Sequence, residues 1–514
     1  MNREPNRWVV AGAVMLGTIM AVLDSSIVNV ALPDMSGTLG ATVEQITWVV
    51  SGYILSSVII MPITALLSAR YGRKRFYMFS VLAFTLASMA CGLARSLPTM
   101  VAFRIVQGVG GGVLMTVSQA ILRETFPAEE QGMAMGLFGM GVVLAPAIGP
   151  TLGGWLTDTY SWPWVFYVNV PVGVANLLLV QRFVHDPPYF ERHRTRIDWW
   201  GIGLLTAGLG ALQLMLERGQ EKNWFESNEI IFLGAVAAAG LVLFVWQELT
   251  SDRPAVDLRL FRNVSFTSAT VLGGFLGVAL FGTLFLLPLF LQRLLGYGAM
   301  ESGLALMPRS LAMAVLMPIA GRLYNRVGPR LMVAVGLTVS AYSFFDLAHL
   351  TLDVGFWDIF FPQVWQGVGF SLIFVALSTA ALATIDRRQM TAASGLYNVV
   401  RQVFGSVGIA VAATQLTHAS STYGATLATR ITPYHPAASQ MLSGAMAALQ
   451  ARGADALTAF RQGLGLLQGM VMRQAAVLAY NHIFQLAMLL LLLGLPLVLF
   501  LSRSAVITET PMAE

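Results

Sequence analysis

Residues 8–30 read WVVAGAVMLGTIMAVLDSSIVNV, an apolar run interrupted by one carboxylate, Asp24. A helix needs about 20 apolar residues to cross the hydrocarbon layer of a membrane, so this stretch predicts a membrane span. Comparable runs recur along all 514 residues, of which 56% are hydrophobic and only 11% charged. Soluble proteins carry about 25% charged residues. The sequence therefore predicts an all-α polytopic membrane protein and excludes a soluble enzyme, a disordered chain and a disulfide-rich secreted module.

The apolar runs predict fourteen transmembrane helices. The first is expected to remain as an uncleaved span, because no small-residue cleavage site follows a short apolar core. The spans are expected at roughly 8–30, 46–69, 76–94, 99–122, 132–156, 164–184, 199–217, 229–249, 266–291, 303–324, 329–350, 355–384, 392–415 and 482–502.

The distribution of basic residues predicts how the chain lies in the membrane. With the N-terminus inside, 20 of the 31 Lys and Arg residues fall in cytoplasmic segments and 8 in external ones. Four of those 8 lie in a single external loop of about 65 residues, which is too long for the positive-inside rule to apply. We therefore expect both termini to be cytoplasmic.

Several kinds of chemistry find no support in the sequence. Cys91 is the only cysteine, so neither an intrachain disulfide nor a multi-cysteine metal site can form. There is no G-x4-G-K-[ST] phosphate-binding motif and no catalytic cluster, which indicates that the protein is neither an ATP-driven transporter nor an enzyme. The net charge of +5 is small and scattered, so nucleic acid is not an expected partner.

Three matches at nearly one spacing indicate that the chain contains two homologous halves. The matched pairs are Gly72 with Gly328, Gln107 with Gln366, and Pro33 with Pro288, at offsets of 256, 259 and 255 residues. Spans 1–6 then pair with spans 9–14. The predicted domains are an N-terminal six-helix bundle at 1–190, two inserted helices at 191–262, and a C-terminal six-helix bundle at 263–514 with a long periplasmic loop at 417–481. Two facing bundles are a transporter architecture with the substrate site near the midplane.

The loops that follow spans 2 and 10 resemble the gating loop G-x-L-a-D-R-x-G-R-[KR] of the major facilitator superfamily. The matching residues are Arg70, Gly72 and Arg73 in the first loop and Gly321, Arg326 and Gly328 in the second. Ala69 and Asn325 stand where the family has its aspartate. The resemblance implies gating loops, but neither loop has the aspartate that centres the cytoplasmic latch of the family.

Spans 4 and 5 extend the resemblance to the fourteen-span drug:proton antiporters of that superfamily. Arg104, Gln107 and Gly108 resemble the motif R-x-x-Q-G. Span 5 resembles the antiporter motif G-x8-G-x3-G-P-x2-G-G, to which Gly136, Gly149, Pro150, Gly153 and Gly154 conform, with Ala145 at one glycine position. Residues 23–33, 164–171, 254–261 and 395–408 also resemble this family, which implies the major facilitator fold with two inserted helices.

The long loop at 417–481 resembles that of the Emr-type inner-membrane subunit of tripartite multidrug efflux pumps. This resemblance implies a bacterial inner-membrane antiporter that exports amphipathic toxic compounds, with the proton as coupling ion and no other cofactor or metal. It also implies a periplasmic adaptor and an outer-membrane channel as partners, beside membrane lipids and small amphipathic substrates. A proton-coupled importer and a lipid or metabolite exporter remain alternatives on the same fold. A membrane scaffold or membrane-embedded enzyme is the second alternative.

Two polar residues of the first half are the leading candidates for coupling. A carboxylate within a span faces a cavity or is protonated part of the time, which makes Asp24 a candidate proton carrier. The alternative is a carboxylate wetted at the outer end of the span. Arg104 shares a helical stripe with Gln107 and cannot itself carry the proton. It either controls a partner carboxylate or hydrogen-bonds backbone carbonyls. Asn29 completes the candidate set in this half.

The second half has no counterpart of Asp24, because the offset puts Ala279 or Phe281 there. Its candidates are Arg309, Gln366 and Arg401. Either arginine contacts an anionic substrate or satisfies a broken helix, and the structural role is favoured. Asp346 and His349 share a face of span 11, which is expected to be a wet helix end.

Small residues in span 5 are expected to form a tight helix contact that reshapes during transport, or ordinary close packing. In the long loop, 437–449 and 454–478 have apolar residues at helical spacing, which predicts amphipathic helices.

Overall fold

The computed structural model describes residues 6–186, 197–251, 254–431 and 434–502. Within these residues fourteen helices are long and apolar enough to cross a membrane, which confirms the predicted number. They include the short seventh span and the tenth span, which carries an arginine. The domain boundary proposed at 190 and the last residues of the chain lie outside the described part.

The first half contains six spanning segments. Its helices are α1 (Arg7–Leu39), α2 (Val43–Ile46), α3 (Trp48–Tyr71), α4 (Arg73–Gly92), α5 (Leu97–Thr125), α6 (Gln131–Thr159), α7 (Trp164–Tyr167) and α8 (Asn169–Phe183). The short helices α2 and α7 precede α3 and α8 in the second and sixth spans. Helix α1 reaches Leu39, nine residues beyond the predicted end, so Asp24 lies near the middle of its helix and not in its outer part.

The inserted pair and the second half follow. The inserted helices are α9 (Trp199–Arg218) and α10 (Asn228–Thr250). The second half is built from α11 (Val264–Arg293), α12 (Ala299–Val327), α13 (Pro329–Leu347), α14 (Phe356–Ala383), α15 (Met390–Arg430), α16 (Pro436–Ala451) and α17 (Ala456–Leu493). Two helices therefore pass well beyond the predicted spans, α15 at its end and α17 at its start.

Two glycines make the tight turns that the repeat aligns. Gly72 joins α3 to α4 with φ of 90°, and Gly328 joins α12 to α13 with φ of 82°. Both values lie in a region that a side chain disfavours, so glycine at these positions lets two spans follow one another almost without a loop.

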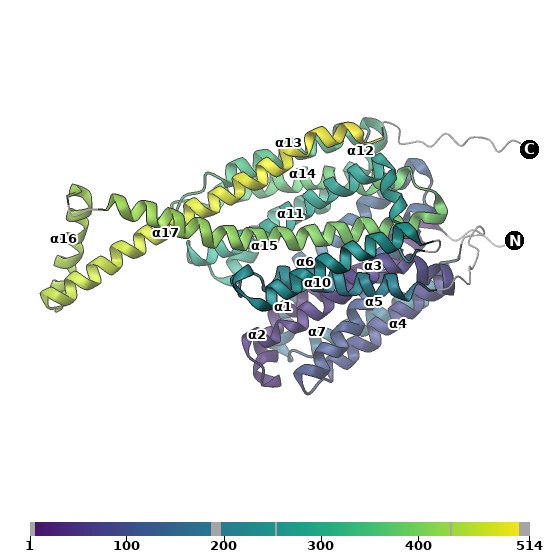
Figure 1. Cartoon of the computed structure of the whole chain (residues 1–514), viewed down its shortest axis with the longest axis horizontal. Helices are drawn as coiled ribbons and strands as arrows, with labels where there is room; N and C mark the ends of the chain where they lie inside the picture. The colour runs from purple at the N-terminus through teal and green to yellow at the C-terminus, as the bar shows by residue number, and fades with distance from the viewer. Residues whose placement is uncertain (1–5, 187–196, 252–253, 432–433, 503–514) are drawn as a thin grey trace, which may run out of the picture.

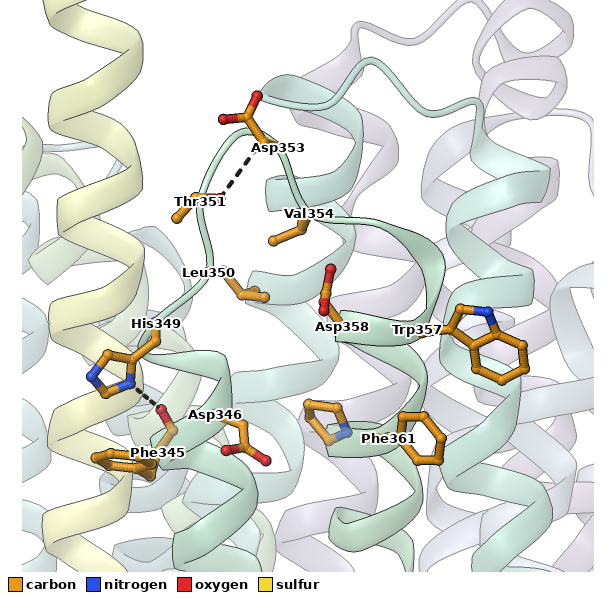
Figure 2. Close-up of a pocket in the computed structure, with 11 residues that line it drawn as sticks. Phe345, Asp346, His349, Leu350, Thr351, Asp353, Val354, Trp357, Asp358 and Phe361 are labelled. Carbon is orange, nitrogen blue, oxygen red and sulfur yellow. Dashed lines mark hydrogen bonds between the residues drawn. The ribbon is translucent and has the colours of Figure 1, made fainter.

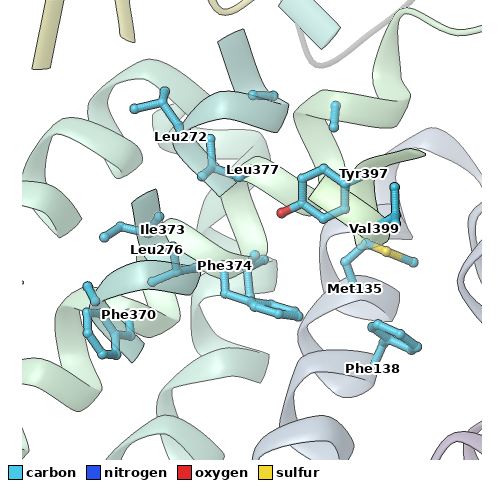
Figure 3. Close-up of a cluster of buried hydrophobic side chains, with 14 of the residues drawn as sticks. Met135, Phe138, Leu272, Leu276, Phe370, Ile373, Phe374, Leu377, Tyr397 and Val399 are labelled. Atoms are coloured by element: carbon cyan, nitrogen blue, oxygen red, sulfur yellow. The ribbon is translucent and has the colours of Figure 1, made fainter. Parts of the chain in front are cut away.

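The halves meet along closely packed helices whose contacts lie toward the end of the bundle that carries both described termini. A Cβ on Gly136 of α6 would lie 2.4 Å from the carbonyl oxygen of Met317 on α12, and one on Gly395 of α15 would lie 2.5 Å from that of Met61 on α3. Figure 3 shows the buried core beside these contacts, where Met135 and Phe138 of α6 face aromatic and aliphatic residues of α14 and α15. We call this end of the bundle the inner end.

The segment 417–481 is helical over most of its length. Helix α15 continues to Arg430, α16 crosses the tip, and α17 returns directly into the last span. A helical hairpin therefore projects from the end of the bundle opposite the two ends of the described chain (Figure 1). Gly424 and Met472 are in contact within this hairpin. The predicted amphipathic helices are present as α16 and the start of α17.

Candidate functional site

A fully buried polar network lies at the centre of the first half. Arg104 on α5 forms an ion pair of 2.5 Å with Asp24 on α1, and neither side chain is exposed. Gln107, one turn further along α5, donates to Asp24 Oδ1 at 2.8 Å and accepts from Arg104 Nη1 at 2.8 Å. The predicted stripe of Arg104 and Gln107 therefore closes around one carboxylate.

Residues outside the predicted set complete this network. Asn169, the first residue of α8, donates to Asp24 Oδ1 at 2.8 Å and to the hydroxyl of Ser88 on α4 at 3.0 Å. Arg104 Nε donates to the carbonyl of Val49 at 2.8 Å, and its guanidinium lies 4.4 Å from the ring centre of Tyr53. Helices α5 and α8 thus donate to the carboxylate on α1, and α3 and α4 hold two of those donors in place. The signal for Asn169 was present, since it is an amide within an apolar run, but sequence alone did not connect it to Asp24.

The arrangement combines an ionisable group with a fixed cation. Burying a charge is costly unless it is paired and hydrogen-bonded, and Asp24 has both an arginine and two amide donors. Arg104 stays charged whatever the state of its neighbour. Among the described residues its Nη2 atom has no hydrogen-bond partner, so the guanidinium has a free donor for another acceptor. Asn29 is exposed, donates to Ser25 within α1, and is not part of the network.

The candidates of the second half form two separate clusters. Arg309 on α12 donates to Gln366 on α14 at 3.3 Å. Arg401 on α15 donates to Asn398 at 3.3 Å, with Phe374 beneath its guanidinium at 5.1 Å. Asn398 in turn donates to Gln119 on α5 at 2.7 Å, across the boundary between the halves. Arg401 therefore belongs to the contact between the halves, whereas Arg309 lies within the second half.

The predicted gating residues lie at the inner end. Gly321 meets Gly132 of α6 so closely that an added Cβ would lie 2.5 Å from its carbonyl oxygen. Arg73 pairs with Glu124 of α5 at 2.6 Å, with both side chains nearly buried. Asn325, at the position of the missing aspartate, donates to the backbone of Glu129 in the opposite half.

Two arginines complete the set of predicted gating residues. Arg70 is half-buried at the end of α3, and Arg326 is exposed at the end of α12. The inner end is therefore closed by backbone contacts and by an asparagine.

The antiporter-like helix α6 serves both halves. Toward the inner end Gly136 meets α12. Toward the other end α6 packs on α1, where a Cβ on Gly149 would lie 2.5 Å from Ser26 Oγ and one on Gly153 would lie 2.7 Å from the carbonyl of Ile27. Ala145 is buried, Pro150 is exposed, and Gly154 is more loosely packed, with Val30 3.8 Å from an added Cβ.

A pocket of about 470 Å³ opens at the outer end of α13 and α14, lined by Asp346, His349, Asp353, Trp357, Asp358 and Phe361 (Figure 2). Two of its polar side chains form hydrogen bonds with backbone atoms three or four residues away in the sequence. Asp358 accepts from Gly355 N at 2.8 Å, and His349 Nδ1 lies 2.7 Å from the carbonyl of Phe345. The described residues contain no group of three or more acidic, His or Cys side chains able to hold a metal ion.

Comparison with known proteins identifies relatives along nearly the whole chain. The pattern of the Major Facilitator Superfamily matches residues 14–409. The multidrug export protein EmrB of Escherichia coli (strain K12) is 36% identical over 487 residues, which is 94% of this chain and 93% of that protein. The fatty acid resistance protein FarB of Neisseria gonorrhoeae is 34% identical over 483 residues, which is 94% of each chain.

Solved structures share the fold at low sequence identity. The human organic anion transporter MFSD10 has a TM-score of 0.58 at 14% identity, covering 95% of this chain and 100% of that one. The proton:xylose symporter XylE has a TM-score of 0.58 at 13% identity and covers 94% of each chain. These two likenesses concern the fold alone.

Proposed function

Because this chain belongs to the Major Facilitator Superfamily, in its fourteen-span drug:proton antiporter family, we propose that it exports amphipathic toxic compounds in exchange for protons. Proteins of this family are transporters and not enzymes. The relatives named for multidrug export and for fatty acid resistance favour amphipathic compounds as substrates. The observation that carries the proton coupling is the buried pair of Asp24 and Arg104 in the middle of the first half.

The pair suggests how proton and substrate would alternate. Protonation of Asp24 removes the charge that Arg104, Gln107 and Asn169 hold, and α1 then loses its strongest contact with α5 and α8. The inner end, now closed by α6 against α12, then separates and admits substrate. Loss of the proton restores the ion pair and favours closure of that end. Substrate and proton thus stabilise different arrangements of the same halves.

Transport in vesicles tests this function and its direction. Inside-out vesicles that contain the purified protein and are acidified inside are expected to accumulate a cationic dye such as ethidium while their lumen loses protons. Vesicles without protein are the control. Dye that leaves the lumen together with protons would instead indicate an importer, and dye movement without proton movement would contradict coupling.

We propose that both termini are cytoplasmic and that the hairpin of α15, α16 and α17 extends into the periplasm of a bacterial inner membrane. The excess of basic residues in predicted cytoplasmic segments supports this orientation. A Ser439→Cys variant in a Cys91→Ala background is expected to react with an impermeant maleimide in intact spheroplasts, and Arg326→Cys only after lysis. The reverse pattern would invert the topology.

The hairpin is proposed to bind a periplasmic adaptor that leads to an outer-membrane channel. Leu457, Phe460 and Leu464 form an exposed apolar stripe on α17 at helical spacing. Such a stripe in water requires cover. Replacing 425–471 by a short linker, which joins Gly424 to Met472 where they already touch, should preserve transport in vesicles and abolish co-purification of the adaptor. Serine at the three stripe positions should weaken capture without shortening the hairpin. Unchanged capture by the shortened protein would exclude the hairpin as the docking surface.

A further inference from the structure

Arg309 is a buried cation that the described residues leave without a carboxylate. Its side chain is only 2% exposed, and it donates a hydrogen bond of 3.3 Å to the amide oxygen of Gln366. In the described part of the chain the buried acidic residues are Asp24, which binds Arg104, and Glu248, which accepts from the backbone of Val256. The nearly buried side chain of Glu124 pairs with Arg73. A buried guanidinium without a counter-charge is unfavourable, so this site is incomplete as it stands.

Two glutamines on α14 add further unused hydrogen-bonding groups. Gln363 and Gln366 are fully buried and lie one helical turn apart on the same side of α14. Among the described residues the Nε2 atom of Gln366 and both amide atoms of Gln363 have no hydrogen-bond partner. Helix α14 approaches α12 so closely that a Cβ on Gly367 would lie 2.7 Å from the carbonyl of Arg309. The guanidinium and the amide donors therefore lie on facing helices, a combination suited to a carboxylate.

The repeat explains what is missing. The offset that pairs Gln107 with Gln366 also pairs Arg104 with Gln363, and the offset of the gating loops pairs Tyr53 with Arg309. The cluster thus occupies the position of the network in the first half, where donors of the same kind converge on Asp24. In the second half an acceptor has to come from elsewhere. Met313 and Met317, further along α12, are buried and provide an adaptable apolar surface.

We propose that Arg309, Gln363 and Gln366 bind the carboxylate of an amphipathic organic acid, with its apolar part against the methionines of α12. This assignment rests on the proposed export function and names a substrate class for it. The cluster is almost fully buried in the described arrangement, so binding of the acid requires a rearrangement of the helices around it. The second half then supplies a fixed positive charge for the substrate, while the first half handles the proton.

Binding of dodecanoate to the full-length protein in phosphatidylcholine nanodiscs tests the proposal, with dodecyltrimethylammonium as the probe that has the same tail and opposite charge. Arg309→Gln is expected to weaken dodecanoate binding at least tenfold. Gln366→Glu places a carboxylate beside Arg309 and should also weaken it at least tenfold while leaving the arginine in place, which guards against loss of fold in the first variant. Arg95→Gln, at an exposed loop, matches the change in charge and should bind as the parent protein does.

Several results would overturn the proposal. Equal dodecanoate affinity in all variants would exclude the cluster, and acetate binding as tightly as dodecanoate would assign it to small anions. Displacement of dodecanoate from the parent protein when phosphatidylglycerol replaces phosphatidylcholine would assign it to lipid headgroups. The assay uses no proton gradient, so a failure of proton coupling leaves its result unchanged. Absence of dodecanoate binding, in turn, leaves proton-driven dye export to be judged in vesicles.

Discussion

The two halves bury an arginine at corresponding depths but treat its charge differently. In the first half Arg104 meets Asp24 at 2.5 Å, and in the second half Arg309 meets an amide oxygen of Gln366 at 3.3 Å. Both halves keep the same close helix approach, through Gly108 against α3 and Gly367 against α12. The packing frame has therefore been retained between the halves while the charge has changed. One half holds a group that can gain and lose a proton, and the other holds a cation that cannot.

The largest effect on transport is expected when the first half loses its buried carboxylate, which the second half lacks. Asp24→Asn keeps the shape of the side chain but leaves Arg104 without a counter-charge, and breaking a buried pair costs about 3–5 kcal/mol of stability. Proton-driven dye export in vesicles should be lost. The double variant Asp24→Asn with Arg104→Gln should recover thermal stability but not export. Full export by Asp24→Asn under a pH gradient would remove the carboxylate from coupling.

The next largest effect is expected from a glycine at the contact between the halves, compared with a glycine of the same helix within one half. Gly136→Ala places a methyl group 2.4 Å from the Met317 carbonyl oxygen and should keep the inner end from closing, at a cost of about 1–3 kcal/mol. Export should fall about tenfold. Spin labels at Arg75 and Arg326 should report a longer distance. Gly154→Ala, where the nearest neighbour of the added Cβ is 3.8 Å away, is the matched control. An unchanged distance between the labels in Gly136→Ala would contradict the contact assigned between α6 and α12.

A smaller effect is expected from a change at Asn169, which completes the network although the sequence did not single it out. Asn169→Ala removes one donor from Asp24 and should cost about 1–3 kcal/mol and several-fold in export. Asn176→Ala is the control, because Asn176 lies on the same helix, is equally buried, and donates to the backbone of Ala13. We expect similar losses of melting temperature in the two variants, with the ratio of protons to dye altered only in Asn169→Ala. An altered ratio of protons to dye in both variants would show that Asn169 has only a structural role.

The smallest effect concerns the hairpin, which only the second half carries. Asp455 caps α17 by accepting from the backbone of Leu457 and Thr458, and hydrogen bonds from Thr458 lower the pKa of this carboxyl. A lowered pKa means that the capping contribution is complete above the ordinary pKa and is lost as the pH falls through the lowered one. Hydrogen exchange at the start of α17 should accelerate in acid, and in Asp455→Ala at all pH values. Identical exchange in the two proteins near neutral pH would exclude the cap.

Sequence predicted the spans well because insertion into hydrocarbon depends on length and apolarity, which are local properties. It also placed Arg104 and Gln107 on one face, since helical spacing is local. It could not bring Asn169 to Asp24, because that contact joins residues 145 positions apart and depends on how α8 packs against α1. It ended the thirteenth span near 415, because apolarity falls there, although helix-compatible residues continue α15 to Arg430.

Continuity of α15 has a mechanical consequence. This helix carries Gly395 and Asn398 at the contact between the halves, and its other end forms one side of the hairpin. Its 41 residues form a rod about 60 Å long at 1.5 Å per residue. If a rod of this length turns about the contact between the halves, its far end moves by roughly 1 Å for every degree of rotation. A small rotation of α15 at the contact between the halves would therefore become a larger displacement of the hairpin.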